Sequence, residues 1–186
     1  KDREGFMVKA IKKGRSEVCL KSLTGEQLEE LRGAKMNEAQ GWVQRQVVRA
    51  IPKNLNISAS ECMKLRWVVT WKAVDGDSRG KKLMARLVVL GFQDPELGTR
   101  EYAAPTMHGR SRGVLCQVIV NNGWTVRKAD ATKAFLQNRK FEPGKEKYIV
   151  AVPELAEVLG IPPGEGAQLL SAAYGLGEAS AEWHET

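Results

Sequence analysis

Residues 65–74, LRWVVTWKAV, and residues 83–92, LMARLVVLGF, decide the fold of this chain. Both stretches are rich in β-branched and aromatic residues, which favour strands. The residues between them, 75–80 (DGDSRG), are typical of a turn. The sequence therefore predicts a β-hairpin over residues 65–92.

The two faces of this hairpin differ in polarity. Side chains alternate between faces along a strand, so one face of the first strand carries Leu65, Trp67, Val69 and Trp71, and the other carries Arg66, Thr70 and Lys72. Arg79, Lys81 and Lys82 lie beside the turn. Long cationic side chains there can reach phosphates without losing their hydration.

Helices are expected on both sides of the hairpin. Thr24 and Gln27 have the spacing of a capping box, and apolar residues recur at helical intervals over 24–49, which predicts one or two helices broken near Gly33 or Gly41. Residues 110–122 fit a further helix that ends at Gly123.

The last third of the chain mixes short strands and helices. Residues 124–130 (WTVRKAD) alternate like a strand, and residues 148–152 read as another, stopped by Pro153 and a helical turn to Gly160. Residues 168–186 are expected to form a strand that turns into a helix at residues 174–176. The expected fold class is therefore α+β, an antiparallel sheet with packed helices.

The composition is that of a globular protein: 186 residues, 42% hydrophobic and 27% charged. It excludes collagen-like, low-complexity and fully disordered chains. There is no run of about 18 apolar residues, and residues 1–15 are charged throughout. We expect an intracellular protein, cytoplasmic or nuclear, that is not secreted and has no membrane partner. Because it begins with Lys1, we expect it to be a piece of something larger.

Charge is distributed unevenly along the chain. All 29 Lys and Arg and 16 of the 22 acidic residues lie in 1–147, a net charge of +13, and residues 148–186 carry six Glu and no Lys or Arg. A basic body of this kind attracts polyanions, so RNA or DNA is the expected partner. The alternative is a solvated surface of mixed charge. Residues 1–23 are expected to be a flexible basic arm.

Several kinds of site are absent from the sequence. The three cysteines are more than forty residues apart, which argues against a disulfide framework and a zinc site, and the two histidines are isolated. Residues 76–82 (GDSRGKK) lack the spacing of a phosphate-binding P-loop, and no nucleophile elbow or zinc-protease motif occurs.

The remaining motif is Asp130 at the end of an expected strand, within ADATKAFL (residues 129–136). With it, the sequence resembles the N-terminal part of the reverse transcriptase of copia-type LTR retrotransposons. The resemblance covers about residues 36–186, and its pieces occur in the family's order: Met36, Glu38, Trp42, Val48, Pro52, Arg66-Trp67-Val68, Lys72, Ala85-Arg86-Leu87-Val88, Gly91-Phe92-Gln93, Ala104-Pro105, Arg112, Trp124, Asp130, Ala134-Phe135-Leu136, Tyr148, Pro153, Tyr174-Gly175-Leu176 and Trp183.

This resemblance implies a right-hand polymerase fold and two-metal nucleotidyl transfer. It implies fingers over residues 24–123 and a partial palm over 124–186, with Mg²⁺ as cofactor and template-primer RNA and DNA and a dNTP as partners. Carboxylate oxygens suit Mg²⁺. By resemblance, Asp130 and the carbonyl of Ala131 would bind metal, Phe135 would be the steric gate against ribonucleotides, and Arg86 with Lys81 or Lys82 would close over the triphosphate. The alternatives are an Asp130 that caps or pairs with Lys128 or Lys133, and a Phe135 that only fills the core.

The sequence departs from the family at two places. The family's second motif, aromatic-x-Asp-Asp, is not reached, and no Asp follows Asp130. After Tyr174-Gly175-Leu176, relatives usually read Lys-Gln-Ala-Pro-Arg, whereas this chain has Glu178 at the nucleotide-contacting Gln and Ala181 at the Arg. We therefore expect a polymerase fragment that is inactive as an isolated chain. The alternatives are a non-catalytic nucleic-acid-binding module and a folded remnant without function.

Overall fold

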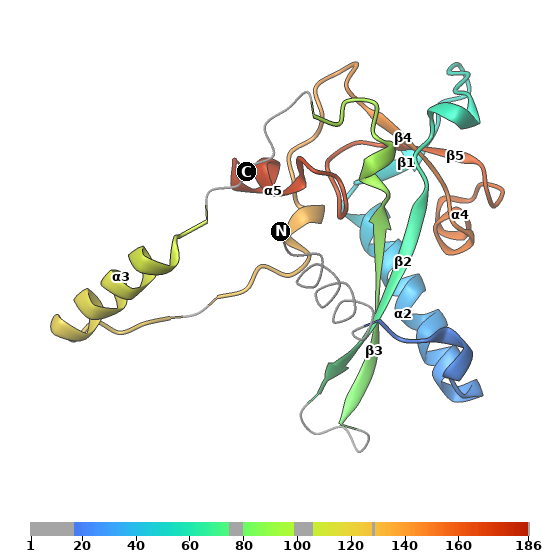
Figure 1. Cartoon of the computed structure of the whole chain (residues 1–186). Coiled ribbons are helices and arrows are strands. Elements are labelled where there is room, and N and C mark those ends of the chain that lie inside the picture. The colour runs from blue at the N-terminus through green and yellow to red at the C-terminus, as the bar shows by residue number, and fades with distance from the viewer. Residues whose placement is uncertain (1–16, 75–79, 99–105, 128, 186) are drawn as a thin grey trace, which may run out of the picture.

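The predicted hairpin is present as two antiparallel strands, β2 (Leu65–Ala73) and β3 (Lys81–Val89) (Figure 1). The computed structural model describes residues 17–74, 80–98, 106–127 and 129–185. Val69 lies opposite Ala85, and both are buried, whereas Arg66 and Arg86 are exposed. The alternation expected from the sequence is therefore confirmed. Most of the expected turn, residues 75–79, lies outside the described residues.

Helix α2 (Gly25–Gln44) packs against β3 of the hairpin. The Thr24 hydroxyl accepts a hydrogen bond from the Gln27 N–H at 3.4 Å, and the Gln27 side chain accepts one from the Thr24 N–H at 3.0 Å. The capping box is thus confirmed. The expected break near Gly33 or Gly41 was wrong, because a helical glycine costs only about 1 kcal/mol, which the burial of Leu31, Ala39 and Trp42 offsets.

A second, three-stranded sheet holds the main core. Its strands are antiparallel in the order β1 (Val48–Ala50), β5 (Gly166–Leu169) and β4 (Lys147–Val150). The strands expected at 148–152 and from 168 correspond to β4 and β5 with ends shifted by a few residues. The largest fully buried side chains include Trp42, Leu87, Ile149, Leu155 and Leu169, which join this sheet to α2 and the hairpin.

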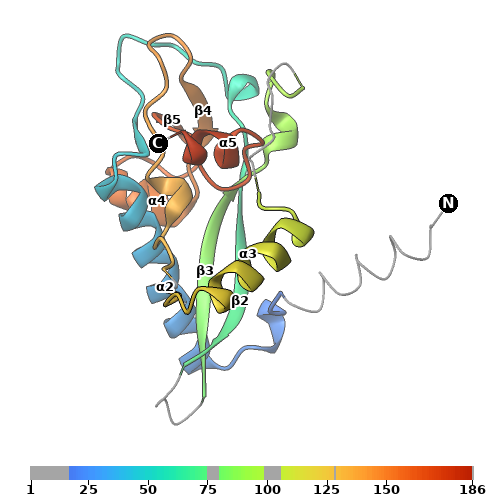
Figure 2. The same ribbon diagram turned by 90° about the vertical axis from the view of Figure 1, so that its left-hand side faces the viewer.

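Two short helices complete this part of the fold. Helix α4 (Pro153–Leu159) packs against α2 and ends at Gly160, where the expected helical turn also ended. The φ of +68° at Gly160 makes it a left-handed cap. Helix α5 (Ala179–His184) lies within the segment 168–186, where a helix was expected. Helix α5 contacts the 3₁₀ turn Ala134–Leu136. Figure 2 shows α2 running alongside the hairpin strands β2 and β3.

The charges that segregate along the sequence meet in the fold. Four of the six glutamates in residues 148–186 face bases from the earlier part of the chain: Glu154 with Lys35, Glu178 with Lys147, and Glu182 and Glu185 with Arg139. These residues therefore form no separate acidic tail. They neutralise part of the basic body, whereas Lys72, Lys81 and Lys82 of the hairpin are exposed.

Helix α3 (Gly109–Asn121) lies apart from the sheets (Figure 1). Its bounds and the following Gly123 (φ +63°) agree with the expected helix. It has no buried residue, and Val114, Val118 and Val120 are exposed. None of the described helices is long and apolar enough to cross a membrane.

The strand expected over 124–130 is not formed in the part of this segment that the structure describes. Trp124 and Val126 are 58% and 68% exposed. Alternating residues form a strand only where a neighbouring strand supplies hydrogen bonds, and none of the described strands lies beside them.

The segment 17–23 lies against the hairpin. The backbone of Glu17 forms an isolated antiparallel β-bridge with Thr70, and its side chain forms an ion pair with Arg66. The Val18 N–H donates a hydrogen bond to the Val69 carbonyl at 2.9 Å. The rest of the expected basic arm, residues 1–16, lies outside the described residues.

Glu154 joins α4 to α2 and β2. Its carboxylate accepts hydrogen bonds from the Lys35 ammonium at 2.8 Å and from the Trp67 indole at 3.2 Å. Burial by itself would raise the pKa of Glu154, but these bonds and the charge of Lys35 outweigh it, and the pKa lies below its ordinary value. The ionised carboxylate is thus the form that the fold prefers.

We expect Glu154→Gln to lower the free energy of unfolding at pH 7 by about 1–2 kcal/mol, because a hydrogen-bonded charge is lost. Since the folded pKa is depressed, this stabilisation is present above the unfolded pKa and is lost as pH falls through the folded one. Urea unfolding at pH 7 and pH 3 should show the gap between wild type and variant closing at low pH. Glu157→Gln, at an exposed site on α4, is the control. A gap independent of pH would contradict the assignment.

Candidate functional site

Two motifs that are distant in the sequence meet near α2, and a third lies on the strand that is hydrogen-bonded to one of them. Phe135 lies in a short 3₁₀ turn (Ala134–Leu136), Tyr174 follows β5, and Arg86 lies on the exposed face of β3. The rings of Phe135 and Tyr174 meet edge to face, with centroids 5.6 Å apart and planes at 71°. Such aromatic pairs contribute about 0.5–1.5 kcal/mol beyond their burial. The fold thus brings Phe135 to Tyr174, a pairing that the sequence did not predict.

The surroundings of the Tyr174 hydroxyl tie Arg86 to the same place. Burial raises the pKa of Tyr174, and the negative charge of Glu38 raises it further, whereas the positive charges of Arg86 and Arg45 lower it. Arg86 therefore lies within electrostatic range of the Tyr174 hydroxyl. The site combines an aromatic pair with two guanidinium groups and one carboxylate.

Asp130 and Ala131 are exposed and lie outside regular secondary structure, five and four residues before Phe135. Among the described residues, no group of three or more His, Cys, Asp or Glu side chains could hold a metal ion. Asp130 is the one carboxylate that the sequence resemblance names for Mg²⁺, and one carboxylate does not make a two-metal site.

Lys133 does not pair with Asp130, one of the alternatives left by the sequence. Its ammonium lies 2.9 Å from the Glu38 carboxylate and 3.4 Å from the Asn37 carbonyl, both on α2. Lys128, the other candidate partner, lies outside the described residues. Sequence reasoning missed the Lys133–Glu38 pair. The available signal was Glu38 itself, a charged residue that the helical pattern places near the apolar Trp42.

Lys81 and Lys82 lie at the turn end of the hairpin, at the opposite end from the three-stranded sheet (Figure 1). The fold does not bring them to Phe135. Lys82 lies directly opposite Lys72, and both are exposed. Like charges directly opposite across two strands repel each other, and an anion bound between them would relieve this. The pair is therefore a better candidate for contact with phosphate than either lysine by itself.

Glu178 lies inside the protein rather than beside a nucleotide. It is 3% exposed, and its carboxylate is 3.1 Å from the Lys147 ammonium, which also forms an ion pair with buried Asp94. Glu96 is 3.6 Å from the same ammonium. The sequence placed Glu178 at a surface by its position in a motif, and a buried lysine 31 residues earlier reverses that environment. Glu178 therefore has a structural position in this fold.

A close approach of two backbones joins the hairpin to the motif Tyr174-Gly175-Leu176. The Val89 N–H donates to the Tyr174 carbonyl at 2.8 Å. A Cβ on Gly175, whose φ is +95°, would lie 2.1 Å from the Val89 carbonyl oxygen, and one on Gly91 would lie 2.2 Å from the Gly175 oxygen. Only glycine fits at these positions. The junction fixes Tyr174 relative to β3 and hence to Arg86.

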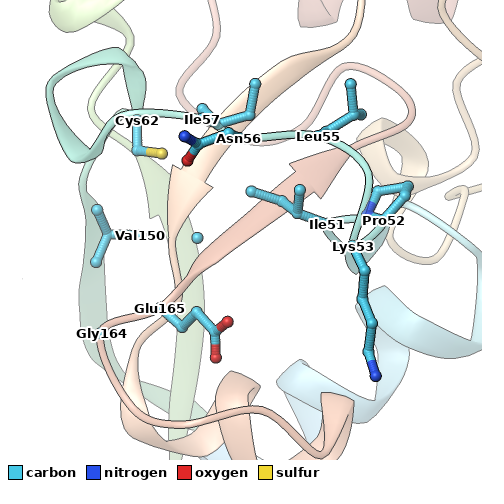
Figure 3. A pocket seen from close by; sticks show the side chains of 11 residues that line it. Ile51, Pro52, Lys53, Leu55, Asn56, Ile57, Cys62, Val150, Gly164 and Glu165 are labelled. Carbon is cyan, nitrogen blue, oxygen red and sulfur yellow. The ribbon is translucent and has the colours of Figure 1, made fainter.

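A cavity of about 470 Å³ lies beside residues 51–57, away from this site (Figure 3). Figure 3 shows Ile51, Leu55 and Val150 around it, with Cys62 at one side and the charged groups of Lys53 and Glu165 at another. Burial, and to a lesser degree the charge of Glu61, raises the pKa of the Cys62 thiol. None of the site residues expected from the sequence lines this cavity.

Comparison with known proteins finds relatives among retrotransposon proteins. The chain is 30% identical over 120 residues to the retrovirus-related Pol polyprotein from transposon RE2 of Arabidopsis thaliana. It is 29% identical over 120 residues to that from transposon RE1 of the same plant. This chain is similar to part of a retrotransposon Pol polyprotein.

The similarity covers 64% of this chain and 8% of each Pol polyprotein. No protein-family model matches the chain, and no solved structure matches it. The Pol similarity agrees with the resemblance found from the ordered motifs and does not by itself specify which Pol activity the region serves.

Proposed function

We propose that this chain is the fingers and first part of the palm of an RNA-directed DNA polymerase of the copia type, within a retrotransposon Pol polyprotein. The observation that carries the proposal is the edge-to-face contact of Phe135 with Tyr174, which is itself hydrogen-bonded to β3, the strand that carries Arg86. These residues lie in three separate motifs of the family, and the similarity to Pol polyproteins supports the same origin.

Each residue has a role in this proposal. Phe135 would be the steric gate that excludes a ribose 2′-hydroxyl, held in place by the Tyr174 ring. Arg86 would contact the triphosphate of the incoming dNTP, and Lys81 and Lys82 would bind phosphates of the nucleic acid or the nucleotide. Asp130 would be the first carboxylate for Mg²⁺.

The isolated 186-residue chain is expected to bind nucleic acid without polymerising it. Two-metal catalysis requires carboxylates that hold both ions, and the chain contains no Asp after Asp130. With Mg²⁺, dTTP and poly(rA)/oligo(dT), we expect no primer extension by the purified chain. Template-dependent synthesis would contradict the incomplete site.

Nucleic-acid binding without catalysis is the second candidate function. It is favoured by the +13 charge of residues 1–147 and by the exposed Lys72–Lys82 pair at the hairpin. When contacts with phosphates dominate binding, the logarithm of the association constant falls linearly with the logarithm of the salt concentration. The slope is about −0.9 for each phosphate that the protein neutralises on a duplex.

Salt titration of binding to a labelled RNA–DNA hybrid tests both candidates. We expect Lys72→Gln/Lys82→Gln to reduce the slope by about 1–2, because one or two phosphate contacts are lost. The control Lys21→Gln/Lys53→Gln removes the same charge from exposed sites outside the hairpin and should change the slope less. Equal slopes for wild type and both variants would count against a hairpin contact with nucleic acid.

A further inference from the structure

Lys133 attaches the segment that carries Phe135 to helix α2. Its ammonium is 2.9 Å from the Glu38 carboxylate. Glu38 is 6% exposed, and its other oxygen accepts a hydrogen bond from the Trp42 indole at 3.4 Å. Trp42 is fully buried in the main core. The ion pair thus links Lys133 to the buried core of the fold.

The backbone at Lys133 is also unusual. Its φ and ψ of 55° and 42° lie in the left-handed region, which is strained for a residue with a side chain. The chain reverses direction there and enters the 3₁₀ turn that contains Phe135, with the Leu136 N–H donating to the Lys133 carbonyl at 2.9 Å. The ion pair with Glu38 can offset this strain because it is partly buried.

The other end of the segment is fixed independently. Asn138 is 4% exposed, and its amide donates to the carbonyls of Ala172 and Ala179 at 3.1 and 3.2 Å. Phe135 therefore lies between an anchor on α2 and an anchor beside Tyr174. The two anchors are two and three residues from Phe135 along the chain.

We infer that Lys133 is a positioning residue that, through Glu38, holds the Phe135 ring against Tyr174 and so sets the sugar preference of the site. The statement about sugar preference rests on the proposed function, whereas the statement about the ring position does not. Resemblance to the family assigns no role to Lys133.

Gly41 offers a test that separates position from stability. It lies on α2 next to the Lys133 side chain, and a Cβ at Gly41 would lie 2.3 Å from the Lys133 Nζ. Gly41→Ala should favour the helix, because alanine is a better helix former than glycine, while displacing the ammonium. Gly33→Ala is the matched control, because it makes the same change on the same helix with open space around the new Cβ.

The readout is the fluorine NMR spectrum of protein labelled with fluorotyrosine. The chain has three tyrosines, and Tyr174→Phe identifies the Tyr174 signal. We expect Lys133→Met and Gly41→Ala to shift this signal and leave that of Tyr148 in place, while Gly33→Ala shifts neither. Lys133→Arg, which keeps the charge, should retain the wild-type position. If Lys133→Met does not fold, Glu38→Gln removes the same ion pair from its acidic side and should shift the Tyr174 signal in the same way.

The second readout is the ratio of dNTP to NTP affinity of the same proteins. We expect this ratio to fall by about tenfold in Lys133→Met and Gly41→Ala, within the hundredfold that a misplacement of about 1 Å can cost. An unmoved Tyr174 signal in both variants would overturn the inference. A moved signal with an unchanged ratio would overturn its sugar-preference part. A wild type that binds no nucleotide would reject the proposed function and leave the ring position to be decided by NMR.

Discussion

Gly175→Ala is expected to lower the free energy of unfolding by about 3 kcal/mol or more. The new Cβ would meet the Val89 carbonyl oxygen at 2.1 Å, and overpacking of this kind costs about 1–3 kcal/mol. The φ of +95° adds the strain of a left-handed residue, about 1–2 kcal/mol. Since whole domains are stable by only about 5–15 kcal/mol, urea unfolding should show a large shift of the midpoint.

Two controls separate contact from backbone strain. Gly144→Ala introduces a side chain at a φ of +87° with nothing within 4 Å, so it reports strain by itself. In Gly91→Ala the new Cβ would lie 2.2 Å from the Gly175 carbonyl oxygen, so this variant measures the cost of the contact. It is compared with Gly33→Ala, whose new Cβ has nothing within 4 Å. We expect Gly175→Ala to cost more than Gly144→Ala, and Gly91→Ala more than Gly33→Ala. Equal costs within each pair would show that the two backbones do not pack closely.

The second large effect is expected from Lys147→Met. Removing the ammonium takes away the cation that the buried carboxylates of Asp94 and Glu178 share. Removal of one partner of a buried ion pair costs about 3–5 kcal/mol. Lys145→Met, at an exposed site two residues earlier, is the control and should change stability little. Unfolding in urea measures both, and equal stability of the two variants would contradict the buried cluster.

The pH dependence of this effect has a definite sign. Burial by itself would lower the pKa of Lys147, but hydrogen bonds from its ammonium to Asp94 and Glu178 outweigh burial and raise it above its ordinary 10.5. A raised pKa gives stabilisation that is present below the unfolded pKa and is lost as pH rises through the folded one. The difference between wild type and Lys147→Met should therefore be constant from pH 7 to pH 10 and decrease only at higher pH.

Features set by neighbouring residues could be predicted from the sequence. The hairpin follows from two alternating apolar runs on either side of a turn sequence. The capping box follows from Thr24 and Gln27, three residues apart. Helix α3 and its end at Gly123 follow from local apolar spacing and glycine. In each case the stabilising groups lie within a few residues of each other.

Features set by distant residues could not be predicted. Glu178 reads as a surface residue until Lys147 and Asp94 are placed around it. The sequence suggests Gly41 as a possible helix break. In the fold, the absence of a side chain at Gly41 leaves room for the Lys133 ammonium. The alternating segment from Trp124 has the pattern of a strand but none of the described strands to pair with. Arg86 and Phe135 were named from the sequence, and Tyr174 as the residue that connects them was not.

The three-stranded sheet also sets the order in which the chain can fold during synthesis. Helix α2 and the hairpin contact each other within residues 25–89, so they can assemble once that stretch has left the ribosome. Strand β1 pairs with β5, so Ala50 can form its strand pairing only after Ala167 has been synthesised. At about 5–20 residues per second this delay is on the order of 6–24 s. Through that interval Val47 and Val48 lack their partner strand, and the nascent chain depends on α2 and the hairpin to keep these apolar residues from other contacts.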